Sequence, residues 1–264
     1  MRVALDGMLV NQCVSGVETA IYALAGALAE HGTASYRFYL PRACPQPVIE
    51  AGERFRTRRA PVRATNRLFR ILWEQFAMPL RLRADGVDLL HAPGYLAPWM
   101  TRKPVVLTVY DLIALDHPRL CRRLNAWNYR LTLPHSIRRA NGIIVPSQAT
   151  ARSLAQRFPK AAAKTTVIPL GVAPSFTPCE AAGDLARLRR AYGLPAHFLL
   201  FVGQLEPKKN LPMLLEAFAL LQRETGCPHK LVLAGRRGWG CEPIDDTIEA
   251  FGLHDDVLIL GAVP

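Results

Sequence analysis

The segment Phe198-Leu-Leu-Phe-Val-Gly-Gln-Leu-Glu-Pro-Lys-Lys-Asn-Leu-Pro-Met-Leu-Leu-Glu-Ala-Phe218 indicates how the chain folds. Its first five residues, 198–202, are apolar, too few for a helix and typical of a buried strand. Gly203 ends this strand, and Asn210 is predicted to cap a helix with Pro212 in its first turn. That helix has one apolar face, formed by Leu211, Leu214, Leu215 and Phe218.

Two adjacent lysines, Lys208 and Lys209, lie between this strand and this helix. The start of a helix carries free amides and a partial positive charge, so the arrangement suits a diphosphate. The alternative is a pair of solvated lysines on a turn, since lysine is mostly exposed in proteins.

Apolar runs of strand length alternate with amphipathic segments along the rest of the chain. We expect further strands at residues 2–5, 36–40, 87–91, 103–112, 143–147, 230–235 and 257–261. We expect further helices at residues 17–30, 67–78, 148–157, 182–192 and 241–252. This alternation predicts the α/β class, with parallel, doubly wound sheets.

Two domains are expected within the 264 residues, with a boundary near Pro178. Prolines and a change in charge mark this boundary, so we assign residues 1–178 to one domain and residues 179–264 to the other. Three strands after the boundary make up about half of a doubly wound domain. The sequence therefore predicts a second domain that is incomplete, in a chain truncated at its C-terminus.

The net charge of +12 is unevenly distributed along the chain. Residues 1–172 hold 24 Lys and Arg against 10 Asp and Glu, whereas residues 173–264 hold 9 against 11. A basic half suits an anionic substrate, an anionic membrane or nucleic acid. No zinc finger, helix-turn-helix or RNA-binding motif accompanies it, so we expect no nucleic-acid partner.

Other features of the sequence point to the cytoplasm. The first residues contain no signal peptide, and no apolar run reaches the length of a membrane-spanning helix. The six cysteines are spread out without a C-x-x-C pair, which argues against a zinc site or a disulfide framework.

Six arginines gather between residues 54 and 67, at Arg54, Arg56, Arg58, Arg59, Arg63 and Arg67. They indicate either a solvated loop or an anchor for anionic lipid or for a phosphate-bearing acceptor. At a lipid surface each basic residue contributes roughly 1 kcal/mol. The helix expected at 67–78 is apolar on two sides, and core packing is favoured over membrane insertion as the reason.

Several motifs resemble those of glycosyltransferases of family 4, which have the GT-B fold. The family's donor-domain signature resembles FVGQLEPKKNL at 201–211, and further similar motifs are LVLAGRRGWG at 231–240, DLLHAPG at 88–94 and VIPLGV at 167–172. The resemblance covers nearly the whole chain in the same order. It implies two Rossmann-like domains, with the family's E-x7-E element beyond the end of this sequence.

The resemblance also implies where the donor binds. Lys209 matches a family lysine, and Lys208 stands where the family usually has arginine, which keeps the charge but loses the bidentate fork. These lysines, with Gly16 and Gly203, are implied to hold the donor diphosphate. Gly235, together with Arg236, is implied to lie on the nucleotide side.

Two residues after the strand expected at 103–112 are implied to be catalytic, Tyr110 and Asp111. Asp111 matches the family and would contact the sugar or the acceptor. Tyr110 replaces the usual histidine, so it can hydrogen-bond a sugar or phosphate but cannot exchange a proton near neutral pH. His91, at the end of another strand, is interpreted as a hydrogen-bonded turn residue rather than a catalytic one.

The function implied by the resemblance is retaining hexosyl transfer. A hexose, with mannose as the common theme, would move from a nucleotide diphosphate sugar to a polysaccharide or lipid-linked acceptor, without a metal or another cofactor. The enzyme would be cytoplasmic and could contact the inner face of an anionic membrane. The alternatives are a non-catalytic module that binds a nucleotide or a membrane surface, and a nucleotide-sugar epimerase of the same fold.

Overall fold

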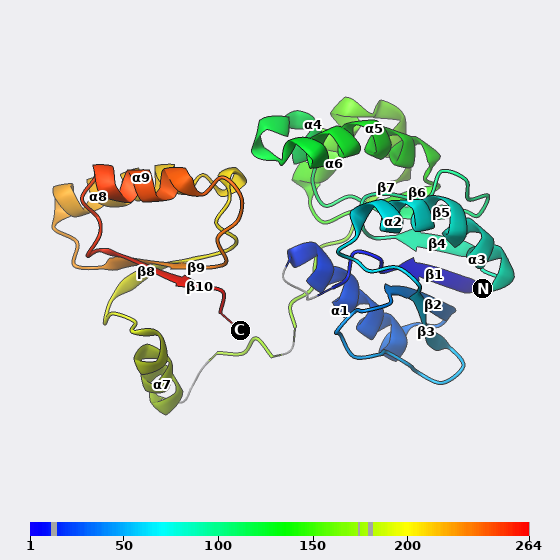
Figure 1. The fold of residues 1–264 in the computed structure, drawn as a ribbon, viewed down its shortest axis with the longest axis horizontal. Helices are drawn as coiled ribbons and strands as arrows, with labels where there is room; N and C mark the ends of the chain where they lie inside the picture. The colour runs from blue at the N-terminus through cyan, green and yellow to red at the C-terminus, as the bar shows by residue number, and fades with distance from the viewer. Residues whose placement is uncertain (12–14, 174, 179–181, 264) are drawn as a thin grey trace. The chain divides into compact units, whose positions relative to one another are not determined.

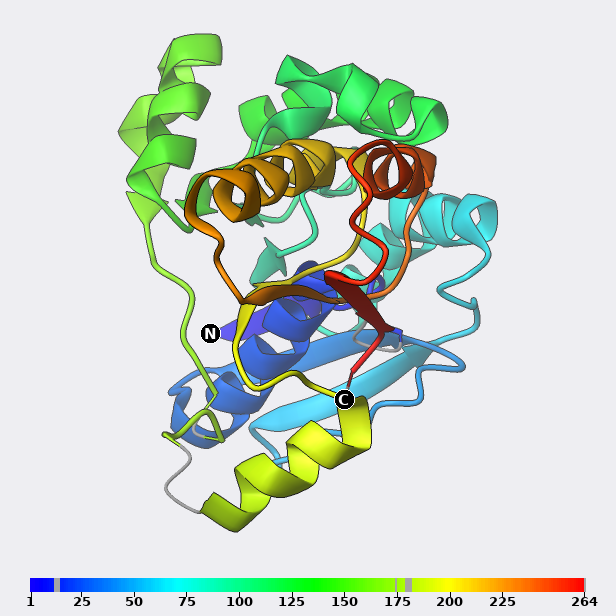
Figure 2. The ribbon, with the colours of Figure 1, turned by 90° about the vertical axis from the view of Figure 1, so that its left-hand side faces the viewer.

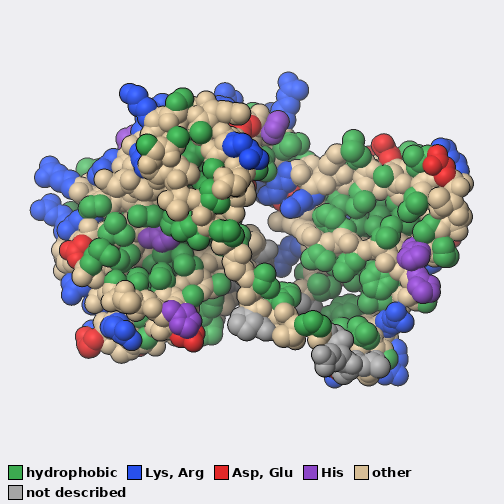
Figure 3. Space-filling view, turned by 180° about the vertical axis from the view of Figure 1, so that it is seen from behind, with side chains coloured by type: hydrophobic (Ala, Val, Ile, Leu, Met, Phe, Trp, Pro, Cys, Tyr) green, Lys and Arg blue, Asp and Glu red, His purple; other side chains and the backbone are tan. Residues whose placement is uncertain are grey.

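The computed structural model describes residues 1–11, 15–173, 175–178 and 182–263, and the chain divides into two compact units (Figure 1). Unit 1 comprises residues 1–116 and 124–173, and unit 2 comprises 117–123 and 174–264. Lys and Arg side chains stand around the rim of unit 1 on the face shown in Figure 3, in keeping with the basic charge of that part of the sequence.

A single parallel sheet forms the middle of unit 1. Its strands are β1 (Arg2–Asp6), β2 (Ser35–Pro41), β3 (Phe55–Ala60), β4 (Leu89–Ala92), β5 (Val105–Thr108), β6 (Gly142–Val145) and β7 (Thr165–Val167). They lie in the order β3-β2-β1-β4-β5-β6-β7, and all six pairings are parallel. The order reverses between β1 and β4, so a ligand crevice is expected beyond the carboxyl ends of these two strands.

Helical segments connect the strands of unit 1. They are α1 (Gly16–His31), α2 (Arg67–Leu72), the π-helical segment η1 (Trp73–Ala77), α3 (Met78–Ala84), α4 (Ile113–Asp116), α5 (Arg123–Arg139), α6 (Gln148–Arg157) and η3 (Pro159–Lys164). A short segment, η2 (Pro118–Leu120), lies outside unit 1. Ser147 caps α6 as expected, because its Oγ accepts a hydrogen bond of 3.1 Å from the Thr150 amide.

Two hydrophobic clusters show that both faces of this sheet are covered. Phe38 and Leu40 of β2 pack with Ile21 of α1 in one cluster, whereas Tyr39 packs in the other with Leu82 of α3. Neighbouring residues of a strand point to opposite faces. The predicted doubly wound α/β arrangement is therefore confirmed for unit 1.

Two expectations for the region after β2 are wrong. The arginine-rich stretch is not a solvated loop throughout, because residues 55–60 form the edge strand β3, parallel to β2, whereas Arg54 and Arg63 lie outside it. At an edge, one side of a strand faces solvent, and charged side chains are common there. Core packing also fails to explain the apolar helix that follows, because four of its side chains are exposed: Leu68, Phe69, Leu72 and Phe76.

Unit 2 contains a smaller parallel sheet in the order β10-β9-β8. Its elements are α7 (Ala182–Tyr192), β8 (Phe198–Val202), η4 (Pro207–Lys209), α8 (Leu211–Thr225), β9 (Lys230–Ala234), α9 (Glu242–Ala250) and β10 (Val257–Gly261). Figure 2 shows α8 and α9 side by side over one face of this sheet. Leu215 and Phe218 of α8 are buried with Ile244 of α9 in the core of the unit.

The expectation of a buried strand at 198–202 is wrong for part of this strand. Leu199, Leu200 and Val202 are exposed, whereas Phe201 packs against the core of unit 2. The reason is that β8 is an edge strand, and α8 and α9 cover only one face of the sheet within the described residues. The strand itself, and its end before Gly203, lie where the sequence predicts them.

Candidate functional site

The loops that follow β8 and β9 are held together by their backbones. The amide of Gly203 donates to the carbonyl oxygen of Ala234 (2.9 Å), and the amide of Leu205 donates to that of Arg236 (3.0 Å). A Cβ atom at Gly235 would lie only 1.8 Å from the carbonyl oxygen of Gly203. Only glycine fits there, so Gly203 and Gly235 bring together the two loops to which the diphosphate and the nucleotide were assigned.

The two predicted diphosphate-binding lysines differ in their surroundings. The Lys208 Nζ forms an ion pair with Glu206 Oε1 at 2.8 Å, and the Glu206 side chain is mostly buried. Lys209 is exposed and has no acidic partner among the described residues, and its Cε lies 3.8 Å from the position of a Cβ at Gly203. Lys209 is therefore the cation of the pair that is available to a ligand beside this loop.

The entrance to α8 differs from the expected cap. Asn210 occupies the N-cap position in the left-handed conformation (φ 50°, ψ 45°), and its side chain forms no capping hydrogen bond. Its side-chain amide instead points at the Met213 sulfur, 3.4 Å away. Asn210 is also the C-cap of the preceding turn of 3-10 helix, which contains both lysines, and asparagine is one of the few residues that adopt the left-handed conformation readily.

Of the two arginines after β9, the exposed Arg236 was the predicted one. Its neighbour Arg237 forms a bidentate pair with Asp245 of α9, at 2.6 and 2.7 Å. This pair holds the pKa of the Asp245 carboxyl below its usual value. Sequence reasoning missed the pair, because the partners are separated by a turn and lie on different elements.

In unit 1 the candidate residues after β5 form a small cluster with Tyr95. The Tyr95 hydroxyl donates to Asp111 Oδ2 (3.1 Å), and the amide of Ile113 donates to Asp111 Oδ1 (3.1 Å). The rings of Tyr95 and Tyr110 lie 5.4 Å apart. Burial raises the pKa of Tyr110 to about 12, so this phenol stays protonated and serves only as a hydrogen-bonding group.

Tyr95 was not predicted as a site residue, but its backbone is unusual. It has φ of 71°, in the left-handed region that bulky residues rarely adopt. Such strain persists where surrounding contacts fix it and is frequent at functional sites. The signal available in the sequence was its place after Pro93-Gly94 at the end of a strand.

His91 is a structural residue, although it lies in strand β4 and not in a turn. Its Nε2 lies 2.9 Å from Thr108 Oγ1 of β5, and burial lowers the pKa of the imidazole to about 4. The ring is therefore neutral at physiological pH.

Gly16 is the exposed first residue of α1, and a Cβ atom there would meet nothing within 4 Å. The start of α1 is capped by Ser15, whose Oγ accepts from the Glu18 amide at 3.3 Å. Among the described residues, no contact requires glycine at this position.

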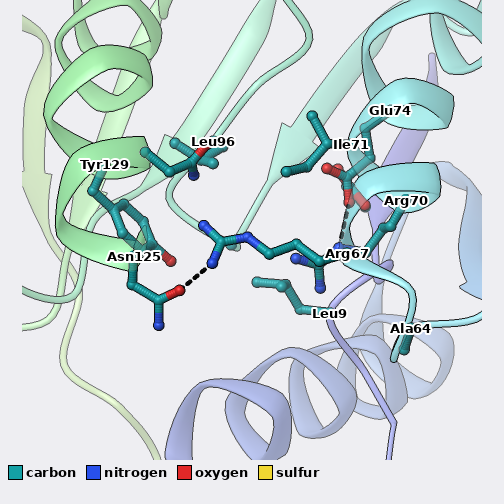
Figure 4. A pocket seen from close by; sticks show the side chains of 12 residues that line it. Leu9, Ala64, Arg67, Arg70, Ile71, Glu74, Leu96, Asn125 and Tyr129 are labelled. Atoms are coloured by element: carbon teal, nitrogen blue, oxygen red, sulfur yellow. Dashed lines mark hydrogen bonds and ion pairs between the residues drawn. The ribbon is translucent and has the colours of Figure 1, made fainter. Parts of the chain in front are cut away.

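A pocket of about 340 Å³ lies in the crevice beyond β1 and β4, between α2 and α5 (Figure 4). We call it the α2–α5 pocket. Arg67 of α2 reaches across it, and its Nη1 donates to Asn125 Oδ1 of α5. Asp6, at the end of β1, and Glu74 also line it. Sequence reasoning did not identify this pocket, because its lining comes from segments far apart in the chain.

The two carboxyl groups of the α2–α5 pocket are buried close to one guanidinium. Glu74 Oε1 lies 3.6 Å from Arg70 Nε, and the Met8 amide donates to Asp6 Oδ1 (3.0 Å). Burial raises the pKa of Glu74 to about 8, with a further contribution from the charge of Asp6. Burial also raises the pKa of Asp6 to about 6, against the opposing effect of Arg70. The pair therefore retains a proton near neutral pH.

Comparison with known families covers most of the chain. Residues 14–176 match the model of glycosyltransferase family 4, and residues 188–264 match that of glycosyl transferases group 1. The chain belongs to glycosyltransferase family 4.

Curated relatives of this family 4 chain include two proteins of Escherichia coli. O-antigen chain mannosyltransferase B is 24% identical over 176 residues, which are 67% of this chain and 46% of that protein. The serotype-specific mannosyltransferase WbdA is 27% identical over 170 residues, which are 63% of this chain and 20% of that protein. The matched part of the chain thus spans less than half the length of these relatives.

Solved structures confirm the predicted GT-B-like fold. The Anabaena protein HepE, in a complex with UDP and glucose, matches 100% of this family 4 chain and 70% of its own, with a TM-score of 0.66 and 18% identity. WaaG, a glycosyltransferase involved in lipopolysaccharide biosynthesis, matches 99% of this chain and 70% of its own, with a TM-score of 0.62 and 14% identity.

Proposed function

We propose that this protein is a retaining glycosyltransferase that moves a hexose, mannose in the first instance, from a nucleotide diphosphate sugar to a polysaccharide or lipid-linked acceptor. Membership of family 4 supports the reaction class, and the names of the two E. coli relatives support the sugar. The observation that carries the proposal is the paired-loop arrangement of unit 2, which leaves Lys209 exposed beside Gly203.

In the proposed reaction, the bond between the anomeric carbon and the diphosphate oxygen breaks, and a bond to an acceptor hydroxyl oxygen forms on the same face. The acceptor proton leaves with the departing diphosphate. Lys209, with a smaller contribution from the ion-paired Lys208, stabilises the charge that develops on this leaving group, in place of a metal ion. Asp111 and Tyr110 contribute hydrogen bonds to the sugar or the acceptor.

The experiment is a transfer assay with GDP-mannose and UDP-glucose as donors and a mannose-terminated oligosaccharide as acceptor. We expect nucleoside diphosphate release that depends on the acceptor, and roughly 100-fold slower turnover in Lys209→Ala. Lys208→Ala should lose less, because Glu206 already neutralises that ammonium. Lys160→Ala, an exposed lysine of unit 1, is the matched control and should keep full turnover.

The same assay separates the alternatives. A sugar epimer without a glycoside product would favour an epimerase. Donor binding without release of nucleoside diphosphate under any condition would favour a non-catalytic module. Equal turnover in Lys209→Ala and the unsubstituted protein would remove the proposed role of this lysine.

We also infer peripheral contact with an anionic membrane, through the exposed apolar side of the helical segment 67–84. Five of its side chains are between 43% and 67% exposed: Leu68, Phe69, Leu72, Phe76 and Leu80. Glu74 is the only acidic residue between positions 54 and 84, and it lines the pocket. An apolar helix side with arginines around it is typical of segments that lie in a membrane interface. None of the helices in the described part of the chain is long and apolar enough to cross a bilayer.

Sedimentation with vesicles tests this contact. We expect binding to vesicles with anionic lipid and loss of binding in Leu72→Ser/Phe76→Ser. Leu188→Ser, an exposed leucine of α7, is the control. Loss of binding only in Arg54→Ala/Arg58→Ala would assign the contact to the arginines around β3 instead. Equal recovery with neutral and anionic vesicles would exclude the electrostatic part of the inference.

A further inference from the structure

A second pocket of unit 1 lies apart from the residues assigned to the transfer reaction. Its volume is about 630 Å³, and it is lined by residues of the last turn of α5 and of the segment 157–164, which includes η3. These two segments lead directly into β6 and β7. The pocket is therefore at the amino ends of parallel strands, whereas Asp111 follows the carboxyl end of β5. We call it the α5–η3 pocket.

Every charged side chain in the described lining of the α5–η3 pocket is basic. These side chains are Arg138, Arg157, Lys160 and Lys164. The surrounding sequence has the same character, because residues 117–179 hold ten Lys and Arg and no Asp or Glu. An anion that enters the pocket therefore meets an attractive potential.

Two of the four cations already have partners within the protein. The Nζ of Lys164 donates to the carbonyl oxygens of Arg138 (3.0 Å) and Ala140 (2.6 Å), so it offsets the partial negative charge at the end of α5. The Nη1 of Arg157 forms an ion pair with Asp116 Oδ1 at 2.9 Å. Stabilisation of the fold explains these two cations without a ligand.

The side chains of Arg138 and Lys160 are exposed, and neither forms an ion pair or a hydrogen bond within the part of the chain that the structure describes. Together they bring two positive charges to the pocket. A phosphate monoester carries a charge of about −1.5 to −2 near pH 7. A guanidinium group can bind two phosphate oxygens at once, and an ammonium group adds a point charge. The two unpaired cations therefore match one phosphate monoester.

The rest of the lining is apolar. Ile137 and Ala161 are buried, Phe158 is half-buried, and Pro159 is exposed. The volume of about 630 Å³ is far more than an inorganic phosphate fills, and it lies within the range of about 300 to 1,000 Å³ that is usual for small-molecule sites. The pocket can therefore accommodate an apolar group that is attached to the phosphate.

We propose that the α5–η3 pocket binds a soluble organic phosphate. The charge of this phosphate monoester is balanced by Arg138 and Lys160, and its apolar part packs against Phe158 and Pro159. The site is separate from the proposed glycosyl transfer and does not depend on it. A bilayer surface fits the pocket less well, because a flat surface does not enter a concave lining whose apolar side chains are mostly covered.

Calorimetric titration of the full chain tests the proposal, with phenyl phosphate as the probe. We expect phenyl phosphate to bind. Benzenesulfonate has the same ring but a single negative charge, so it should bind at least fivefold more weakly. Inorganic phosphate lacks the ring and should bind at least threefold more weakly.

Substitutions on both sides of the pocket locate the binding. Arg138→Gln and Lys160→Gln should each weaken the binding of phenyl phosphate at least fivefold. They lie on different segments, so a local folding defect cannot account for both losses. Arg130→Gln and Arg152→Gln are the matched controls, because these exposed arginines belong to the same stretch, lie outside the lining and lose the same charge. Both controls should bind as the unsubstituted protein does.

Several results would overturn the proposal. These are no binding of phenyl phosphate, equal affinity in all four variants, or equally tight binding of benzenesulfonate. A loss in Lys209→Ala but not in Arg138→Gln would place the phosphate at the loop of unit 2 instead. Binding only to vesicles that contain phosphatidic acid, without competition by phenyl phosphate, would assign the cations to a lipid surface. Because no sugar donor is present, none of these results bears on the transfer reaction, and a lack of turnover would leave this site standing.

Discussion

The loop site of unit 2 and the α2–α5 pocket of unit 1 hold their charged groups in opposite ways. Lys209 is exposed on a turn, and the loop beside it is held by backbone contacts at Gly203 and Gly235. Arg70 and Glu74 are mostly buried as an ion pair, and the protonation of Glu74 depends on its burial and on the charge of Asp6. The exposed charge can be removed with little effect on folding, whereas a change to the buried pair alters stability and binding together.

The largest effect is expected from Gly235→Ala, which disrupts the close contact between the backbones of Gly235 and Gly203 in the loop site. The added Cβ would lie 1.8 Å from the Gly203 carbonyl oxygen, so the two loops must separate. We expect a loss of about 3 kcal/mol in the free energy of unfolding of unit 2, together with loss of donor binding. Denaturant unfolding measures the first, and calorimetric titration with GDP-mannose and UDP-glucose the second.

Gly183→Ala is the control for this substitution, because Gly183 lies in α7 with open space around it. Alanine there should stabilise the helix slightly. If both alanine variants unfolded alike, close packing of the two loops would not be what requires glycine at 235.

Asp111→Ala should have the next largest effect, because the partly buried cluster of Asp111, Tyr95 and Tyr110 combines structural hydrogen bonds with the proposed contact to the substrate. Its removal leaves the Tyr95 hydroxyl and the Ile113 amide without their acceptor, at a cost of about 2 kcal/mol. Turnover should fall by more than this loss of stability explains, and transfer assays at a temperature where both proteins are folded measure it. Asp116→Asn, which weakens an exposed pair with Arg157, should cost less than about 1 kcal/mol and leave turnover unchanged.

Glu74→Gln tests the buried pair of the α2–α5 pocket through the pH dependence of the protein's stability. The pKa of Glu74 is raised in the folded protein, so folding takes up a proton between the unfolded value and about 8. Its contribution is therefore present below the unfolded pKa and is lost as pH rises through about 8. We expect stability to fall by about 2 kcal/mol between pH 5 and 8.5, and this fall to be much smaller in Glu74→Gln.

Thermal unfolding between about pH 5 and 8.5 measures this change in stability. Glu224→Gln, an exposed glutamate of α8, should follow the unsubstituted protein. Identical pH profiles for all three proteins would mean that Glu74 is not held protonated in the pocket.

The smallest effect on stability is expected for Gly16→Ala. A Cβ at this exposed position meets no atom within 4 Å, so the free energy of unfolding should change by less than about 0.5 kcal/mol. If the donor diphosphate approaches the backbone here, the KM for the donor should rise about tenfold while stability stays constant, in contrast to Gly235→Ala. An unchanged KM would show that the glycine serves neither the fold nor the donor.

The sequence was sufficient for those parts of the fold that local patterns specify. The strand at 198–202, the end of that strand at Gly203, the helix at 182–192 and the Ser147 cap all depend on neighbouring residues. Strand β3 escaped prediction because three of its six residues are arginines at a sheet edge, where apolar periodicity is weak. Exposure of the 67–84 helix was also missed, since an apolar stripe gives no information on what covers it.

The same division applies to the candidate sites: residues within one short motif could be predicted, whereas contacts between distant segments could not. The lysines of the unit 2 loop lie within one short motif and could be named from it. The hydrogen bond between Tyr95 and Asp111 and the meeting of Asp6 with Glu74 depend on strand order, which places distant segments together. The ion pair of Lys208 with Glu206 was not foreseen either, because it depends on a side-chain conformation two residues away.

Strand β3 also bears on the association of two copies of this protein through their sheet edges. An open strand at the border of a sheet can recruit the same strand of a second molecule and so begin a growing stack of sheets. Here Arg58 and Arg59 are both exposed, and the guanidinium of Arg59 donates to the carbonyl oxygen of Cys44 at 2.8 Å. Two such borders would repel each other on approach, so the arginines disfavour edge-to-edge pairing of β3 between two molecules.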